Sequence, residues 1–408
     1  MRFKLGVLAA LGAAAIAVPG SGAGTGLPLS TNQQVYTYLA SIGVDPTGVV
    51  IQRGLRNYAG PDCPGPGWTC TTATAVVQIA PAGGENKVDC PQFRGGGDDD
   101  EVLVVQNANG GNNNVRCYQE SHDTPAAALT FPFTQTNTTG NNFLDVDQRI
   151  FQDEGSSQKA TTTANLAQET DFGDNHLHLS QTIKQDTSET SVSGTQSQTG
   201  DLDTNIDQDA GNNNYADFVQ RLDQNGTASG DGVSQSQRGN HFGDVSQTAP
   251  EEGSGGNHFT AHQTERQVLQ GDGTQSQFGP QFCCAKQFGN EQNSSLHIHQ
   301  DSFQRANQED ADQVSESTGM YDTFFVPDDF TSAVTSLDEE GPSKFMILHH
   351  LANNVDRITA QESGPGEHQV FTTCQSQPEE YEEAGCFSTA EDDELDLLEH
   401  SVPATEWP

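Results

Sequence analysis

One pattern recurs along the chain between about residue 78 and residue 304, and it limits what the chain can fold into. Each copy reads Asn, five residues, Gln, three residues, Gln, with a Gly shortly before the Asn. The clearest copies are Asn142–Gln152, Asn175–Gln185, Asn214–Gln224 and Asn257–Gln267. Alternate residues of a copy are mostly apolar, apolar, Gln, apolar, Gln. This period of two predicts a β-strand with those residues on one face.

Recurrence of one strand pattern predicts a stacked array, because a single unit cannot bury its own apolar face. A companion half precedes the turn in places, as at Gln235–Asn240 and Gln287–Asn290, so each unit reads strand, Gly/Asn turn, strand. The intervals between copies are unequal. The predicted fold is therefore mainly β, an irregular stacked β-repeat or β-solenoid-like array with small flanking segments and a disordered acidic tail.

The repeated glutamines are the predicted working parts of the array. Stacked strands lie about 4.8 Å apart, and a Gln amide is both donor and acceptor, so each amide can bond to its copies above and below. We therefore expect structural glutamines in buried columns. Their predicted members are Gln92, Gln119, Gln148, Gln181, Gln220, Gln247, Gln263, Gln300, Gln152, Gln185, Gln224, Gln267 and Gln304.

The segment Gln208–Gln220 resembles the curlin repeat of bacterial curli, in which a Gln precedes a Gly and Asn turn and a second Gln follows. Here Gly211, Asn214 and Ala216 match the curlin pattern, and similar copies cover about half of the chain. The unequal intervals, the cysteines and the many acidic residues depart from that pattern. The resemblance implies a curlin-like stack and, in function, self-assembly into fibres or matrix.

The chain divides into segments of different composition. Residues 1–23 have a basic start, an apolar stretch and a small-residue site, which is the pattern of a secretory signal peptide. Residues 24–75 are predicted to form a small N-terminal segment with a disulfide loop, residues 76–304 the repeat array, and residues 305–377 a C-terminal segment that contains β-strands. Residues 378–408 are an acidic tail, for which we expect disorder.

The chain has 8 cysteines, and in an exported protein these favour disulfides. The candidates are Cys63, Cys70, Cys90, Cys117, Cys374 and Cys386. Cys90 and Cys117 hold the same position in consecutive copies, two residues before the repeated Gln. If those strands stack, the two side chains become neighbours within disulfide reach. The sequence does not identify partners for Cys283 and Cys284.

The formal net charge of −40 excludes nucleic acid and anionic membranes as favoured partners. The apolar stretch of the signal peptide is too short to span a bilayer, so we expect no membrane span. The expected location is secreted, either extracellular or on the cell surface. The expected partners are further copies of this chain or components of an extracellular surface.

Two sets of side chains suit a metal ion. The candidate ligands are His176, His178, His297, His299, Asp201, Asp203 and Asn205. Paired imidazoles on one strand face can bind Zn²⁺ or Cu²⁺, and a solvent-facing polar ladder is the alternative. The Asp and Asn residues alternate like the ligands of a calcium loop, but Ile206 stands where that loop requires Gly. We expect no cofactor, with calcium as the open alternative.

The sequence carries no G-x-S-x-G, H-E-x-x-H or P-loop motif, and we expect no enzymatic activity. The function that the sequence predicts is a secreted structural or cell-surface repeat protein that self-assembles into curlin-like fibres or matrix. The alternative is an extracellular solenoid that binds a carbohydrate or a divalent cation, as an adhesin-like module.

Overall fold

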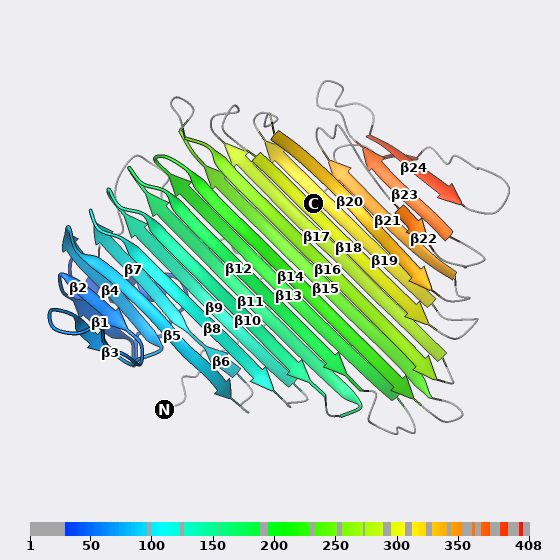
Figure 1. Ribbon diagram of the computed structural model, residues 1–408, viewed down its shortest axis with the longest axis horizontal. Helices are drawn as coiled ribbons and strands as arrows, with labels where there is room; N and C mark the ends of the chain where they lie inside the picture. The colour runs from blue at the N-terminus through cyan, green and yellow to red at the C-terminus, as the bar shows by residue number, and fades with distance from the viewer. Residues whose placement is uncertain are drawn as a thin grey trace.

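Two parallel sheets run the length of the computed structural model, and the chain alternates between them (Figure 1). The structure describes residues 29–95, 99–122, 126–153, 155–187, 195–228, 233–250, 255–271, 274–288, 295–306, 312–323, 329–340, 344–352, 361–363, 369–375, 384–390 and 400–402. The predicted signal peptide lies outside these residues. The predicted mainly β, solenoid-like stack is confirmed.

Sheet A contains the first strand of each unit. In spatial order its strands are β1 (Val50–Arg53), β4 (Ala75–Ala82), β7 (Leu103–Asn109), β9 (Ala126–Asn137), β11 (Ser157–Thr170), β13 (Thr195–Ala210), β15 (Ser234–Thr248), β17 (Thr274–Phe288), β19 (Asp312–Thr323), β21 (Lys344–Ala352), β23 (Gln369–Gln375), β24 (Ala384–Ala390) and β25 (His400–Val402), and β6 (Asp99–Glu101) pairs with β9.

Sheet B contains the second strand of each unit. In spatial order its strands are β3 (Thr69–Thr71), β2 (Arg56–Ala59), β5 (Glu85–Gly95), β8 (Asn113–His122), β10 (Asn142–Gln152), β12 (Asn175–Asp186), β14 (Asn214–Ala228), β16 (Asn257–Gly271), β18 (Ser295–Ala306), β20 (Asp329–Glu340) and β22 (Gln361–Ser363). One sheet A strand, its turn and the following sheet B strand, such as β9 and β10, form one rung.

Equivalent positions of successive rungs are in register. In sheet B, Asn142 pairs with Asn175 and Gln148 pairs with Gln181. Burial alternates residue by residue along β10, so the apolar and Gln positions face inward between the two sheets. The period-two prediction is therefore confirmed, and the register follows from stacking like on like.

The rungs widen along the chain. Strands β1 and β2 have 4 residues each, whereas β13 has 16 and β14 has 15. The lengthening is visible in Figure 1 from the blue N-terminal strands to the green strands of the middle. Wider rungs have room for a second apolar layer and for additional Gln columns, which the first rungs lack.

The array is longer than the predicted segment 76–304. Its first rung, β1 and β2, lies before residue 76, and strands β19 to β23 continue the parallel stacking after residue 304. Strand β24 pairs with β23 in the antiparallel direction, and β25 pairs with β24 in the same way. Both lie within residues 378–408, the acidic tail, whose predicted disorder stays a prediction.

A column of glycines forms the turn between the two strands of a rung. A Cβ added to Gly111 would lie 1.6 Å from the carbonyl oxygen of Gly84, and one added to Gly140 would lie 1.8 Å from that of Gly111. At Gly173 the distance to the Gly140 oxygen would be 2.1 Å. The backbone of one rung occupies the space of a side chain on the next, which explains the Gly before the Asn.

One helix, α1 (Asn32–Ser41), covers the outer face of sheet A near its N-terminal end. Thr31 caps it, with its side chain accepting from the Gln34 N–H and the Gln34 side chain accepting from the Thr31 N–H. Val35 and Leu39 pack with Val77 and Val105 of the sheet. The helix therefore hides outward apolar residues of the first rungs from solvent.

Candidate functional site

The predicted glutamine columns of sheet B form two hydrogen-bonded ladders inside the array. In the first, each Gln Nε2 donates to the Gln Oε1 of the preceding rung, at 2.8 to 3.0 Å. In the second, the same bonds are 2.7 to 2.8 Å. The first ladder contains Gln119, Gln148, Gln181, Gln220 and Gln263, and the second Gln152, Gln185, Gln224 and Gln267. All are at most 2 % exposed, so both columns are confirmed over these rungs.

The other predicted members of the Gln columns have different outcomes. Register places Gln300 beside Gln263 and Gln304 beside Gln267, which agrees with the prediction. The prediction for Gln92 is wrong, because a register shift after Cys90 pairs Phe93 with Gln119. Gln247 is also misplaced by the sequence, because it belongs to β15 of sheet A.

A glycine inside a strand explains why the sequence pattern assigns Gln247 to the wrong sheet. The Gly239–Asn240 pair reads as a turn in the sequence, but both residues lie within β15. Gly239 faces inward, where an added Cβ would lie 2.4 Å from Leu222 Cδ2. The Glu265 carboxylate is closer still, with its Oε1 2.0 Å from that Cβ position, so the glycine leaves space for two side chains of the other sheet.

Sheet A contains a longer Gln ladder, of whose members the sequence pattern predicts Gln247 alone as part of a column. Its members are Gln52, Gln78, Gln106, Gln135, Gln168, Gln208, Gln247 and Gln287, linked by Nε2-to-Oε1 bonds of 2.7 to 2.8 Å. Successive members are 26, 28, 29, 33, 40, 39 and 40 residues apart. The signal in the sequence is a Gln some residues before each Asn, but its distance to the Asn varies with the turn.

The repeated asparagines form a fourth ladder, at the start of each sheet B strand. Its members are Asn57, Asn86, Asn113, Asn142, Asn175, Asn214 and Asn257, linked by bonds of 2.8 to 2.9 Å. Here each Nδ2 donates to the following rung, whereas each Gln donates to the preceding rung. The Asn and Gln amide dipoles therefore run in opposite directions along the stack.

Backbone carbonyls accept the second N–H of these amides. The second N–H of Gln168 donates to the backbone oxygen of His176, across the turn in the same rung, at 3.1 Å. The second N–H of Asn142 donates to the Glu169 oxygen in the next rung, at 2.9 Å. Each sheet A Gln of this kind thus joins the two strands of one rung, whereas each Asn joins one rung to the next. The sheet B glutamines also reach the next rung, as when Gln224 donates to the Arg238 oxygen at 3.0 Å. Amides with both roles satisfied make a rigid interior.

At the N-terminal end of the array, the sheet A Gln ladder ends at Gln52. Gln52 Nε2 has no earlier Gln to reach and donates instead to the Thr69 oxygen of β3, at 2.7 Å. At the other end, register places Thr323 beside Gln287 and Val334 beside Gln300. The ladders therefore end within the array, while parallel strands continue beyond them.

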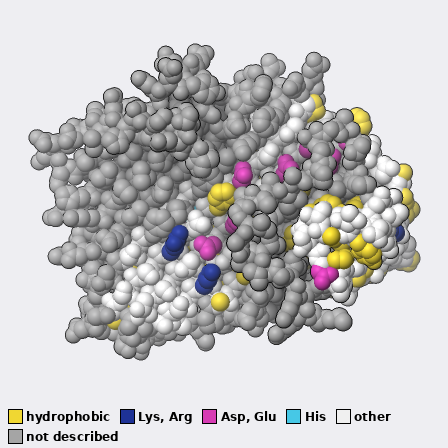
Figure 2. Space-filling model, turned by 180° about the vertical axis from the view of Figure 1, so that it is seen from behind, with side chains coloured by type: hydrophobic (Ala, Val, Ile, Leu, Met, Phe, Trp, Pro, Cys, Tyr) yellow, Lys and Arg dark blue, Asp and Glu magenta, His cyan; other side chains and the backbone are white. Residues whose placement is uncertain are grey.

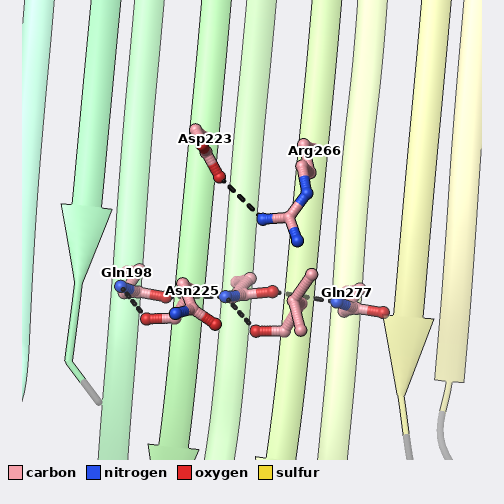
Figure 3. Close-up of polar contacts among 7 residues, drawn as sticks. Gln198, Asp223, Asn225, Arg266 and Gln277 are labelled. Carbon is pink, nitrogen blue, oxygen red and sulfur yellow. Dashed lines mark hydrogen bonds and ion pairs between the residues drawn. The ribbon is translucent and has the colours of Figure 1, made fainter.

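The wide rungs carry a further Gln column in sheet A. Gln198 accepts from Gln237 at 2.7 Å, and Gln237 accepts from Gln277 at 2.9 Å (Figure 3). Gln198 also donates to the Asn225 carbonyl oxygen of sheet B at 3.1 Å. On the outer side, Arg266 pairs with Asp223 of the neighbouring rung at 3.0 Å.

Two apolar cores lie between the sheets, separated by the first sheet B Gln ladder. The turn-side core lies next to the Asn ladder and runs from Ala59 to Cys283. The far core lies beyond the Gln ladder and is smaller. Its members are Ala127, Leu129, Ile150, Ala160, Ile183, Leu202 and Leu222.

The far core ends at two buried ionisable residues. Register puts Glu265 beside Leu222 and His241 beside Leu202. Glu265 is 1 % exposed and His241 is 0 % exposed, and their side-chain polar atoms have no hydrogen-bond partner among the described residues. Burial raises the pKa of Glu265 well above its usual value and lowers the pKa of His241 to about 3. Burial therefore favours the neutral form of both side chains.

The cysteine predictions hold where side chains are described. Cys63 is bonded to Cys70, and Cys90 is bonded to Cys117 across neighbouring rungs, with Cα–Cα distances of 5.9 and 4.5 Å. Register places Cys374 opposite Cys386 in β23 and β24. Cys283 is buried in the turn-side core.

The histidine pairs are not brought together. His178 pairs in register with Asp217, followed by Thr260 and then His297, so the two pairs are three rungs apart. The ring of His176 instead stacks between Phe143 and Tyr215. Among the residues that the structure describes, no group of three or more His, Cys, Asp or Glu side chains is arranged to hold a metal ion.

The proposed calcium loop is wrong in geometry. Asp201, Asp203 and Asn205 lie along strand β13 and point outward from sheet A, rather than curling around a cation. Neighbouring acidic residues of this face repel one another. Burial and the charges of Asp209, Asp171 and Asp207 raise the pKa of Glu169 to about 7. Among the described residues visible in Figure 2, a few acidic and basic side chains lie apart from one another, and hydrophobic side chains gather at the right of the view.

In comparisons with known proteins, no family model, no curated protein and no solved structure matches this chain. Within the described part of the chain, no helix has the length and apolar character needed to cross a membrane.

Proposed function

We propose that this chain is a secreted structural protein of the cell surface or matrix, whose array of amide ladders is the functional part. The observation that carries this proposal is the unbroken sheet A ladder of buried glutamines from β1 to β17. Such ladders resist solvent and unfolding, because every amide would be left unpaired by a local opening. The signal peptide pattern and the disulfides support an extracellular setting.

Self-association is the proposed mode of action. A stack of parallel strands presents unpaired backbone groups at its ends, and these can pair with another copy. The net charge of −40 opposes this contact between copies. Protonation of the stacked acids or their bridging by calcium would remove the repulsion. The short terminal strands, such as β1 with 4 residues and β3 with 3, would slow addition at the N-terminal end.

Light scattering of the mature chain from pH 7 to pH 4, with and without calcium, tests the proposal. We expect a monomer at pH 7 in the absence of calcium and elongated polymers at low pH or with calcium. A variant that lacks residues 29–49, and therefore α1, exposes the outward apolar residues of the first rungs, so faster association of this variant alone would indicate lateral contact rather than growth at the ends of the stack. A chain that stays monomeric under every condition contradicts self-association.

A further inference from the structure

A groove runs along the outer face of sheet B, parallel to the stack. It crosses strands β8, β10, β12, β14 and β16 and has a volume of about 510 Å³. We name it the ladder groove. One wall is a column of rings: Phe143, His176, Tyr215 and His258. The other wall is the next outward column: Arg116, Asp145, His178, Asp217 and Thr260.

The rings of the first wall are stacked on one another. Their centroids are 4.9, 4.8 and 4.7 Å apart, with interplanar angles of 8°, 7° and 9°. Each inner ring therefore has both faces covered by its neighbours, and ring edges line the groove. A sugar that needs an open aromatic face finds none along this wall. A planar aromatic ligand does find a partner, because its face can rest against ring edges in the favoured edge-to-face geometry.

The second wall selects the charge of the ligand. Asp145 and Asp217 are half-exposed, with side chains 50 % and 51 % accessible, and they lie two rungs apart. Each has one exposed ion-pair partner, Arg116 at 3.6 Å and His178 at 3.1 Å respectively. Such pairs contribute little and are readily exchanged. The net charge of −40 further concentrates cations at the surface.

The ring wall of the ladder groove does not oppose a cationic ligand. Burial lowers the pKa of His176 below its usual value, so the middle of the ring wall carries no positive charge at neutral pH. The groove spans five neighbouring strands, which at about 4.8 Å per strand gives a length of about 19 Å between the outer two. A rod-shaped molecule of two or three linked rings fits that length.

We propose that the ladder groove binds an elongated, planar aromatic cation, which lies along the stack with its face against the ring edges and its charge beside Asp145 or Asp217. This binding is a property of the single folded chain. It goes beyond the structural role proposed above and does not require self-association.

Thioflavin T, a planar cationic dye, is the probe for the test. Its fluorescence is titrated with the full chain at pH 7 without calcium, where light scattering confirms the monomer. We expect saturable binding to the monomer that weakens as salt is added. Congo red, an elongated planar anion, should bind at least about tenfold more weakly, because the carboxylates repel it.

Variants locate the site. Tyr215→Ala interrupts the ring wall and should weaken thioflavin T binding about tenfold, by loss of edge-to-face contact and burial. Asp145→Asn with Asp217→Asn should weaken it about fivefold and reduce the salt dependence. The matched controls are Phe172→Ala, a turn aromatic that is 71 % exposed, and Asp203→Asn on sheet A, and neither should change affinity.

Circular dichroism and the midpoint of urea unfolding establish that each variant retains the fold. Equal affinity of the wild type, Tyr215→Ala and the double Asp variant would overturn the proposal. Dye binding that appears only with polymers, or equal binding of the anionic dye, would overturn it as well. Because the monomer is the species titrated, failure here leaves the proposed self-association untouched.

Discussion

The turn-side core and the far core lie between the same two sheets but follow different rules. The turn-side core extends from the first rung to β17 and contains only apolar residues and cysteine. The far core begins at β9, where the strands become long enough to reach it, and its last members are Leu202 and Leu222. In the next rung, His241 and Glu265 hold the same positions.

The difference shows what locks a rung in place. On the turn side, the glycine turn, the Asn ladder and the sheet A Gln ladder tie every rung to its neighbours at fixed points. A change at one rung there disturbs the next. On the far side, the second sheet B Gln ladder and the column of Gln198, Gln237 and Gln277 tie the wide rungs together. Within this frame a rung exchanges leucine for an ionisable residue and still stacks.

The largest expected effect comes from the turn. Gly140→Ala places a Cβ 1.8 Å from the Gly111 carbonyl oxygen, so the rungs must separate. We expect a loss of at least about 3 kcal/mol in the free energy of unfolding, measured by urea titration. Gly83→Ala is the matched control: its turn has φ of +74°, but an added Cβ meets nothing within 4 Å. It should cost about 1 kcal/mol. Equal costs would show that close stacking does not require the glycine column.

The second prediction replaces Glu265, the ionisable residue that follows Leu222 at the end of the far core. Glu265→Leu restores the residue type of the neighbouring rung and should stabilise the chain by about 2–4 kcal/mol at pH 8. Because the folded pKa of Glu265 is raised, its contribution to stability is complete below the unfolded value near 4.5 and is lost as pH rises. The gain should therefore shrink toward pH 4, as measured by urea titration at each pH.

Glu265→Gln is the control for charge, because it keeps the shape and removes the titration. It should flatten the loss of stability above pH 4.5. His241 acts in the opposite direction: its folded pKa is about 3, so its contribution is complete above pH 6.5 and is lost as pH falls toward 3. Glu265 and His241 together therefore favour an optimum between pH 4.5 and pH 6.5. A wild-type stability that does not depend on pH across these ranges would contradict the buried, unpartnered positions.

The third prediction compares a residue of the first sheet B Gln ladder, which separates the two cores, with a residue of the outer surface. Gln220 donates to Gln181 at 3.0 Å and to the Phe242 oxygen at 2.9 Å, and accepts from Gln263 at 2.8 Å. Gln220→Leu leaves these partners unpaired and should cost about 1–3 kcal/mol. Asp217→Asn, on the outer face of the same strand, should change stability by no more than about 0.5 kcal/mol. Similar losses for the two variants would count against the ladder as the divider.

The smallest effect belongs to the ion pair outside the far core. Arg266 and Asp223 lie 3.0 Å apart on neighbouring rungs, with side chains 47 % and 20 % exposed. A double-mutant cycle with Arg266→Ala and Asp223→Ala should give a coupling below about 1 kcal/mol, because solvent screens the pair. A coupling larger than the Gln220→Leu loss would mean that the outer face, rather than the ladder, holds the far side together.

The sequence by itself determined the strands, their inward faces and much of the stacking. A period of two and a repeated Asn–Gln spacing predict which residues of β10, β12, β14 and β16 align, because a shift of one residue would turn every apolar side chain outward. The same register placed Cys90 beside Cys117, and the structure has that disulfide.

The tertiary structure decided how the two sheets meet. The sheet A Gln ladder escapes the pattern because its distance to the Asn depends on the turn, and the bonds that align it cross from rung to rung. Gly239 resembles a turn in the sequence, but it lies inside strand β15, where Leu222 and Glu265 of the opposite sheet occupy the space beside it. Glu265 and His241 are polar by type, and only the packing of both sheets around them shows that they are buried. Local spacing fixes a strand and its faces, whereas burial of a side chain depends on residues that are far away in the chain.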